Sequence, residues 1–347
     1  MAFLFQRVLR WGSIGGMLLV GSASLLAEQR ELTVQPPTES WRQVPGSAVG
    51  HPFSRLGNFD VLNHRVNGGE IQIAVSAGKL PVSQTELLGW IDHAASAVIN
   101  YYGKFPVASL SLVVLTDDGD GVHGGNERGG VRISIKLGKN TRVADLDDDW
   151  RLTHEFFHLG FPDVPERFHW MEEGLSTYLE PLARARIGRL PPERVWKDMV
   201  EGMPQGLPEA GDQGLDRTPT WGRTYWGGAL FWLLADVEIR ERTGNKKSLD
   251  DAVRAIWSQG GDGSADWTAE KVLQQGDRAT GLKVLEELHQ RMGNKPVETD
   301  LPALWQRLGV TYRNHRVTLD DRAPLESVRK AMTEVLPTKH TKDHENE

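Results

Sequence analysis

The segment His154-Glu155-Phe156-Phe157-His158 is the feature that most constrains how this chain folds. Two histidines four residues apart project from one face of an α-helix and can share one metal ion, so the segment predicts a helix. A neutral imidazole nitrogen suits Zn²⁺, and Glu155 lies beside the same face, where a carboxylate can act as general base. Because a catalytic zinc takes three protein ligands, a third must come from elsewhere in the chain.

Acidic residues that could supply this third ligand follow closely, on a second predicted helix that begins near His169 and runs past Glu180. Glu172 and Glu173 both qualify by their chemistry, since a carboxylate from either completes a two-histidine, one-glutamate site. The metzincin pattern continues with a glycine and a third histidine. It is excluded, because the chain has Phe161 and Val164 at those two positions.

The segment after the motif resembles that of the gluzincins, and within them the aminopeptidase N and glycyl aminopeptidase families. Those families have a tryptophan, two residues, Glu-Gly, an apolar residue, two small residues and a tyrosine. This chain matches in register at Trp170, Glu173, Gly174, Leu175 and Tyr178. The resemblance implies one Zn²⁺ per chain, with Glu173 rather than Glu172 as third ligand and Glu180 as a carboxylate that supports the ligands. It extends from Gly78 to about Gly309.

A second segment with this resemblance is Thr224–Leu230, which is similar to the stretch that supplies the transition-state tyrosine in aminopeptidase N-like enzymes. By this resemblance Tyr225 would hydrogen-bond the developing oxyanion. The alternative is an ordinary core or rim tyrosine. Two departures are visible: Gly227 replaces the family's lysine, and the fourteen residues between His158 and Glu173 form a shorter connection.

A third segment, Gly124–Arg128, stands where aminopeptidases of this group have a glycine-rich Met-Glu-Asn stretch. The resemblance implies that Glu127 binds the free α-amine of a substrate. The alternative is a solvated loop carboxylate.

The order of the remaining patterns predicts an α+β fold. After an irregular lead-in (28–65), we expect a strand over 70–76, a helix over 84–102, a strand over 110–116, a loop over 117–130, an edge strand over 131–137, and then helices only. The resemblance implies a thermolysin-like two-lobed metallopeptidase over 66–315, with a mixed-sheet lobe (66–160) and a helical lobe (161–315). Residues 316–347 are expected to be a C-terminal extension with a disordered tail.

The N-terminus predicts export. Arg7 and Arg10 precede an apolar run that ends near Ala27, so residues 1–27 are expected to be a cleaved signal peptide or a retained anchor. The protein would then be periplasmic or secreted, and in contact with a membrane only if the segment is retained. The chain has no cysteine, which excludes disulfides and thiolate chemistry, and a net charge of -7 gives no nucleic-acid footprint.

These observations predict a zinc-dependent hydrolase of peptide bonds, with a peptide or protein as substrate. Whether it is an aminopeptidase or an endopeptidase stays open. The alternative from another class is a non-catalytic, zinc-stabilised peptide-binding or scaffold protein of the same fold. The intact Glu155 counts against that alternative, because a structural zinc site needs no general base.

Overall fold

The computed structural model describes residues 40–77 and 80–335. The predicted signal segment 1–27 and the polar tail beyond Pro337 lie outside these residues, so both remain predictions. Within the described part of the chain, no helix is both long and apolar enough to cross a membrane.

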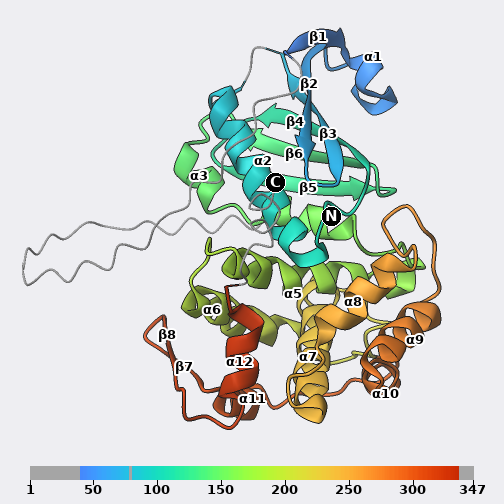
Figure 1. Ribbon diagram of the computed structural model, residues 1–347, viewed down its shortest axis with the longest axis vertical. Helices are drawn as coiled ribbons and strands as arrows, with labels where there is room; N and C mark the ends of the chain where they lie inside the picture. The colour runs from blue at the N-terminus through green and yellow to red at the C-terminus, as the bar shows by residue number, and fades with distance from the viewer. Residues whose placement is uncertain (1–39, 78–79, 336–347) are drawn as a thin grey trace, which may run out of the picture. The chain divides into compact units, whose positions relative to one another are not determined.

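A six-stranded mixed sheet forms the upper part of the molecule in Figure 1. Its strands lie in the order β1-β2-β3-β4-β6-β5. β3, β4 and β6 run parallel to one another, whereas β1 pairs antiparallel with β2, β2 with β3, and β5 with β6. The strands are β1 Arg42–Pro45, β2 Asn58–Val66, β3 Gly69–Ser76, β4 Ser109–Asp117, β5 Val122–Arg128 and β6 Arg132–Gly138.

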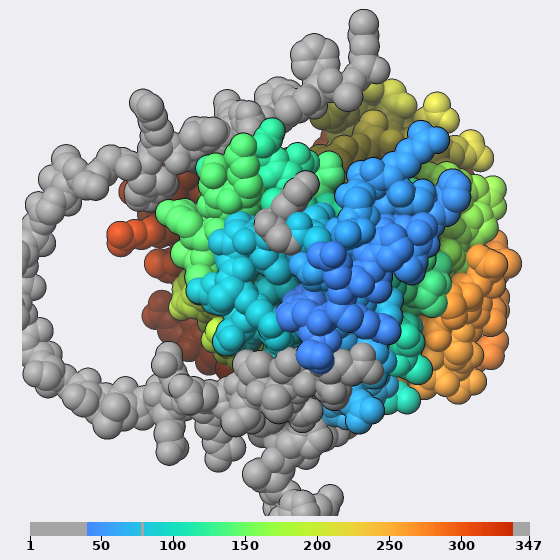
Figure 2. All heavy atoms as spheres, turned by 90° about the horizontal axis from the view of Figure 1, so that it is seen from above, coloured from blue at the N-terminus to red at the C-terminus, as the bar shows by residue number. Residues whose placement is uncertain are grey.

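One face of the sheet is covered by helix α2 (Gln84–Tyr102), which has the bounds that the sequence predicts. Alternate strand residues such as Ile73, Leu112 and Ile135 are fully buried in the same core cluster as the apolar side of α2. The opposite face carries a smaller cluster around Phe59. Figure 2 looks onto this end of the molecule, where the blue segment that starts at β1 lies beside cyan α2.

The lead-in over 28–65 is not irregular throughout, and that prediction is wrong for its second half. Residues 42–45 and 58–66 form strands β1 and β2, with short helical turns between them, α1 (Gly46–Val49) and η1 (His51–Phe53). Gly46, Gly50 and Pro52 fall in or beside these turns, and Phe53 and Phe59 pack edge to face across the connection. Strand β2 is therefore held by packing against the sheet, which the local composition does not reveal.

The predicted loop over 117–130 is also wrong in part, because β5 lies within it and forms the edge of the sheet. The segment that was expected to be the edge strand, 131–137, forms β6. This strand is not at the edge, because it is paired on both sides, with β4 and with β5. Gly124 has a φ of 68°, and the register shifts between His123 and Gly125. This glycine-containing bulge gives β5 a low strand propensity, so the sequence pattern does not identify it.

The charged residues on one face of β6 led to the prediction of an edge strand, but their contacts within the sheet lobe explain them. Arg132 lies over the ring of Phe53, and Lys136 forms an ion pair with Asp117 at 3.0 Å. These residues line the side of the sheet away from α2, where the apolar cover is thin.

Helices follow the sheet, which confirms the predicted α+β fold with a sheet lobe and a helical lobe (Figure 1). They are α3 Val143–Asp147, α4 Arg151–His158, α5 Trp170–Arg186, α6 Pro192–Gly202, α7 Gly228–Thr243, α8 Leu249–Ser258, α9 Ala269–Thr280, α10 Val284–Met292, α11 Leu301–Leu308 and α12 Glu326–Thr333. Shorter turns are η2 Glu166–Phe168, η3 Met203–Gly206 and the π-helical η4 Arg223–Gly227. The prediction of helices only after the sheet is wrong at one place, because β7 Val310–Arg313 and β8 Arg316–Leu319 form a hairpin before α12, and this hairpin crosses the boundary predicted at residue 315.

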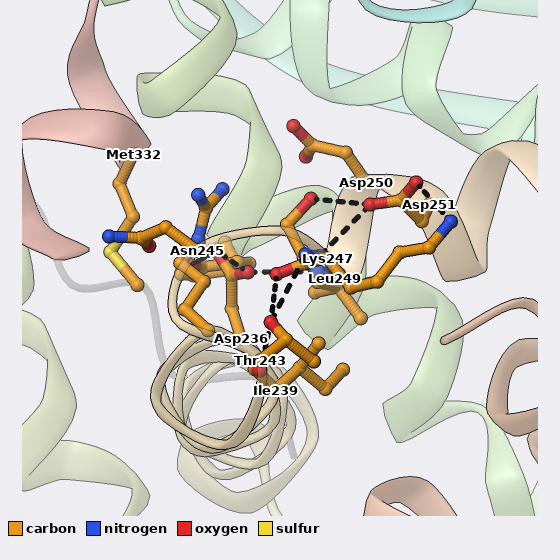
Figure 3. A network of polar contacts seen from close by, with 12 residues as sticks. Asp236, Ile239, Thr243, Asn245, Lys247, Leu249, Asp250, Asp251 and Met332 are labelled. Carbon is orange, nitrogen blue, oxygen red and sulfur yellow. Dashed lines mark hydrogen bonds and ion pairs between the residues drawn. The ribbon is translucent and has the colours of Figure 1, made fainter. Parts of the chain in front are cut away.

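A buried polar network fastens α5 to α7 and α8. Tyr178 Oη of α5 donates to Asp236 Oδ2 of α7 at 2.8 Å. Asp236 Oδ1 accepts from the Leu249 N–H that begins α8, also at 2.8 Å. Figure 3 shows how Asp236 and the residues around it join the end of α7 to the start of α8, where Asp251 accepts from the Ser248 N–H as part of a capping box. Each contact satisfies a buried polar group, so α5 has a fixed position relative to both helices.

Candidate metal and catalytic site

Helix α4 carries the motif, and its start is fixed by Asp149. The Asp149 carboxylate accepts from the Arg151 and Leu152 N–H groups, each at 3.1 Å, which satisfies two free donors of the helix N-terminus. The helix therefore begins at Arg151, after this cap, and α3 precedes it as a separate short helix. His154 and Glu155 are buried, and His158 is nearly so.

Helix α5 brings Glu173 to the two histidines. Glu173 Oε2 lies 3.0 Å from His154 Nε2 and 3.6 Å from His158 Nε2. One ligand atom from each of the three residues lies within 4.8 Å of the other two. Two imidazole nitrogens and one carboxylate oxygen are the donors of catalytic zinc sites of the two-histidine, one-glutamate kind, so the residues present fit a zinc ion.

The electrostatics of the cluster favour an anionic Glu173. Burial by itself raises the pKa of Glu173, but hydrogen bonds from His154, His158 and His169 outweigh burial and hold that pKa well below its usual range. Burial lowers the pKa of His158, and here the same carboxylate outweighs burial and raises it to about 9. The pKa of His154 is lowered, mainly by burial.

Glycines allow the helices around the site to approach one another. A side chain on Gly174, the residue after the candidate ligand, would overlap the backbone of Gly228 at the start of α7. A side chain on Gly228 would likewise overlap the Trp170 carbonyl. The Glu-Gly and Gly-Gly pairs in the sequence therefore set the close packing of α5 on α7, which holds Glu173 near Tyr225.

Tyr225 lies on η4, one turn of π-helix that leads into α7. Its ring stacks on that of His154, with centroids 6.2 Å apart and planes at 22°. Burial raises the pKa of Tyr225, and the charge of Glu173 and a hydrogen bond to it raise that pKa further, so the phenol stays a donor at neutral pH. π-Helical turns occur often at functional sites, and this one turns Tyr225 toward the metal cluster.

Glu155 packs against the edge strand β5. A side chain on Gly125 would overlap the Glu155 carboxylate, which therefore lies directly over the strand at its bulge. Burial raises the pKa of Glu155 to about 7, while His158 and the Glu127 N–H, which donates to the carboxylate, lower it. A carboxyl group with a pKa near neutrality can both accept and release a proton.

The side chain of Glu127 lies on β5 and is half-buried. Its Oε1 accepts from the Gly130 N–H at 2.5 Å. Burial raises the pKa of Glu127 to about 7, against the effects of that hydrogen bond and of His158. Glu127 is thus brought to the neighbourhood of the cluster by a strand rather than by the expected loop.

Glu180 lies two turns after Glu173 on α5, where it accepts from Arg184 Nη1 at 2.9 Å. Burial raises the pKa of Glu180 to about 7, against the effect of Arg184. The partner that the structure gives Glu180 is thus an arginine of its own helix rather than a ligand histidine. Its role in supporting the metal ligands stays a prediction.

Two further residues lie next to the cluster: His169, and Glu172, which was the alternative candidate for the third ligand. His169 Nε2 lies 3.3 Å from Glu173 Oε1, and His169 Nδ1 lies 3.4 Å from Glu172 Oε2. Glu172 Oε1 accepts from the Val164 N–H at 2.8 Å, which ties α5 to the short connection after the motif. The spacing of His169 and Glu173, four residues on one helix face, was the signal in the sequence.

Comparisons with known proteins find similar structures but no similar sequence. No model of a known protein family matches the sequence, and no curated protein matches it. An aminopeptidase N family protein from Idiomarina loihiensis is similar in structure over 74% of this chain and 50% of its own, with 16% identity and a TM-score of 0.58. An M1 zinc metallopeptidase from Deinococcus radiodurans is similar over 70% of this chain and 53% of its own, with 13% identity and a TM-score of 0.47.

The chain spans about half the length of these two proteins. The likeness to the Idiomarina protein shows the fold: the described residues share the fold of this aminopeptidase N family protein, as the resemblance in the sequence implies.

Proposed function

We propose that this protein is a zinc-dependent peptidase. The observation that carries the proposal is the cluster of His154, His158 and Glu173, whose ligand atoms lie within 4.8 Å of one another, with Glu155 beside it on α4. A zinc ion held there would lower the pKa of water and polarise a carbonyl group. The retained carboxylate of Glu155 supports a catalytic rather than a structural site.

Other residues of the chain would carry out proton transfer, stabilise the oxyanion and hold the substrate. Glu155, with a pKa of about 7, takes the proton of the attacking water and passes it to the leaving amine. The Tyr225 hydroxyl, kept protonated by burial, donates a hydrogen bond to the oxyanion that develops on the scissile carbonyl. The edge strand β5 can pair with an extended peptide and hold it in line with both groups.

The finer proposal is an aminopeptidase, with an endopeptidase as the alternative. Glu127 supports it, because a half-buried carboxylate near the cluster can form a charge-assisted hydrogen bond with a free α-amine. Peptides with free and acetylated N-termini separate the two: an aminopeptidase cleaves only the free series, and an endopeptidase cleaves both.

The test of the proposal combines metal content with turnover. Protein prepared without chelators should hold about one zinc per chain. Glu155→Gln should keep that zinc but lower peptide hydrolysis by about 10²–10⁴-fold. Glu270→Gln, an exposed control on α9, should leave hydrolysis unchanged. Absence of zinc, or full activity of Glu155→Gln, would overturn the proposal. Zinc without cleavage of any peptide would favour the non-catalytic binding protein.

We also propose that the protein is exported, on the basis of Arg7, Arg10 and the apolar run to Ala27. Sequencing the N-terminus of the protein from periplasm or medium tests this. A start just after Ala27 indicates cleavage of a signal peptide, and an intact N-terminus in the membrane fraction indicates an anchor. Recovery only from the cytoplasm would contradict export.

A further inference from the structure

The exposed aromatic side chains are concentrated at one place. Among the tryptophan, tyrosine and phenylalanine side chains of residues 40–77 and 80–335, the exposed ones are those of Trp150 and Trp221, at 42% and 60% exposure. Leaving a tryptophan in water forgoes the free energy of burying a large apolar ring, and such exposure in a folded protein often marks an interaction site. Both tryptophans belong to the surroundings of the candidate site.

The two rings continue the aromatic stack of the site outward in both directions. Trp150 meets the ring of His154 edge-on, with centroids 5.6 Å apart and planes at 81°. Trp221 stacks on Tyr225, with centroids 5.6 Å apart and planes at 26°. Since Tyr225 itself stacks on His154, the four side chains form a row, Trp150-His154-Tyr225-Trp221, that has a metal ligand and the oxyanion donor at its centre.

The elements that carry the tryptophans hold their rings in fixed positions. Trp150 directly precedes α4, and the Arg151 guanidinium lies over its ring at 4.8 Å from the centroid. Trp221 lies two residues before the start of η4 and stacks on Tyr225, four positions later. Side chains that are exposed but already held by a neighbour lose little freedom when a ligand binds.

We infer that Trp150 and Trp221, at opposite ends of this row, each bind a planar, apolar side chain of the peptide substrate, one for each of the two residues that flank the scissile bond. This inference rests on the proposed peptidase function. A side chain stacked on either end of the row would lie beside His154 and Tyr225, where the scissile bond must be. The row thus favours the substrate as occupant, because a lipid surface or another protein seated on both tryptophans would cover the metal cluster.

The test measures binding in Glu155→Gln, so that the peptide is not consumed. Tripeptides carry phenylalanine, cyclohexylalanine or alanine at the first or the second position, and calorimetry gives each dissociation constant. At either position, phenylalanine should bind about tenfold more tightly than alanine, with cyclohexylalanine in between because it has similar bulk and no π-face. Adding Trp221→Ala should reduce this ratio toward one at one position and Trp150→Ala should reduce it at the other, whereas Trp221→Phe should restore part of it.

Matched measurements separate this selection from damage to the site. Leu56→Ala, at another exposed apolar residue (52%), should leave the ratio unchanged. Each tryptophan variant is also made with Glu155 intact, where a displaced Tyr225 or His154 would slow hydrolysis of all peptides alike and leave the ratio of phenylalanine to alanine substrates as it was. Such a uniform loss, or equal binding of all three side chains, would overturn the inference.

The outcome also distinguishes this inference from the proposed function. Hydrolysis without preference for an aromatic residue would support the peptidase function and contradict the aromatic binding sites. A preference in binding that depends on the tryptophans, with no hydrolysis by the wild type, would support the aromatic binding sites and contradict the peptidase function. Binding of lipid vesicles that depends on both tryptophans, without selection among the peptides, would also overturn the inference.

Discussion

The imidazole of His169 and the carboxylate of Glu173 lie one helical turn apart at the start of α5, with His169 Nε2 3.3 Å from Glu173 Oε1. The other oxygen, Oε2, lies near His154 and His158. The two oxygens of the candidate ligand therefore have different partners: one faces the cluster, and the other is held by His169. This arrangement orients a carboxylate that would otherwise rotate freely about its last bond.

His169→Ala should therefore weaken metal binding without unfolding the protein, because the His169 side chain is 42% exposed. Loss of such an orienting partner typically lowers metal affinity by about 10–100-fold. Competition with a chromogenic chelator measures the zinc dissociation constant. His51→Ala, an exposed histidine of η1, is the control. Equal zinc affinity of His169→Ala and wild type would show that His169 does not orient Glu173.

The edge strand gives a steric prediction. A methyl group on Gly125 would overlap the Glu155 carboxylate, so Gly125→Ala should displace either Glu155 or β5. We expect zinc to be retained and kcat to fall by about tenfold or more, since a small misplacement of a catalytic group has a large effect. Gly89→Ala on α2 is the matched control, because nothing lies within 4 Å of its added methyl group. An unchanged kcat in Gly125→Ala would mean that Glu155 does not act from this position.

The parts of the site that lie on helices could be predicted from the sequence. The spacing of His154 and His158 matches the helical period, and the register of Trp170 to Tyr178 selects Glu173 over Glu172. Both signals are local, and the structure brings the three predicted ligands together.

The parts that depend on contacts between distant segments could not be predicted. Strand β5 contains a glycine bulge, and Gly125 is small because Glu155 packs on it from α4, which no local pattern reveals. The π-helical turn at Tyr225 likewise depends on its packing, since a side chain on Gly206 would overlap the backbone at Gly227. The contact of His169 with Glu173 differs from these, because it joins two residues four positions apart on one helix.

Tyr225 offers a test of oxyanion stabilisation. Tyr225→Phe removes one hydroxyl and keeps the ring that stacks on His154, so fold and zinc content should be preserved. Loss of one oxyanion donor typically lowers kcat by about 10²–10³-fold, with a much smaller change in KM. Single-turnover hydrolysis, in which chemistry limits the rate, is the measurement. A rate equal to that of the wild type would assign Tyr225 to packing alone.

The pH dependence of binding tests Glu127. Burial raises the pKa of Glu127 to about 7, so its carboxylate is charged above that pH and becomes neutral as the pH falls through it. Binding of a free α-ammonium group should therefore weaken on acidification. Between pH 8 and pH 6 the ionised fraction falls about tenfold, and KM for free-amine peptides should rise accordingly.

Glu127→Gln supplies the matched comparison, because Glu155 also has a raised pKa of about 7 and alters activity over the same range. The substrate amine gains its proton as the pH falls, which acts in the opposite direction but equally in both proteins. The ratio of kcat/KM for wild type over Glu127→Gln removes the effect of the substrate amine and most of the effect of Glu155, since Glu127 is a minor cause of the raised pKa of Glu155. It should be well above one at pH 8 and approach one at pH 6. A ratio that does not change with pH would mean that Glu127 does not bind the substrate amine, and would favour the endopeptidase.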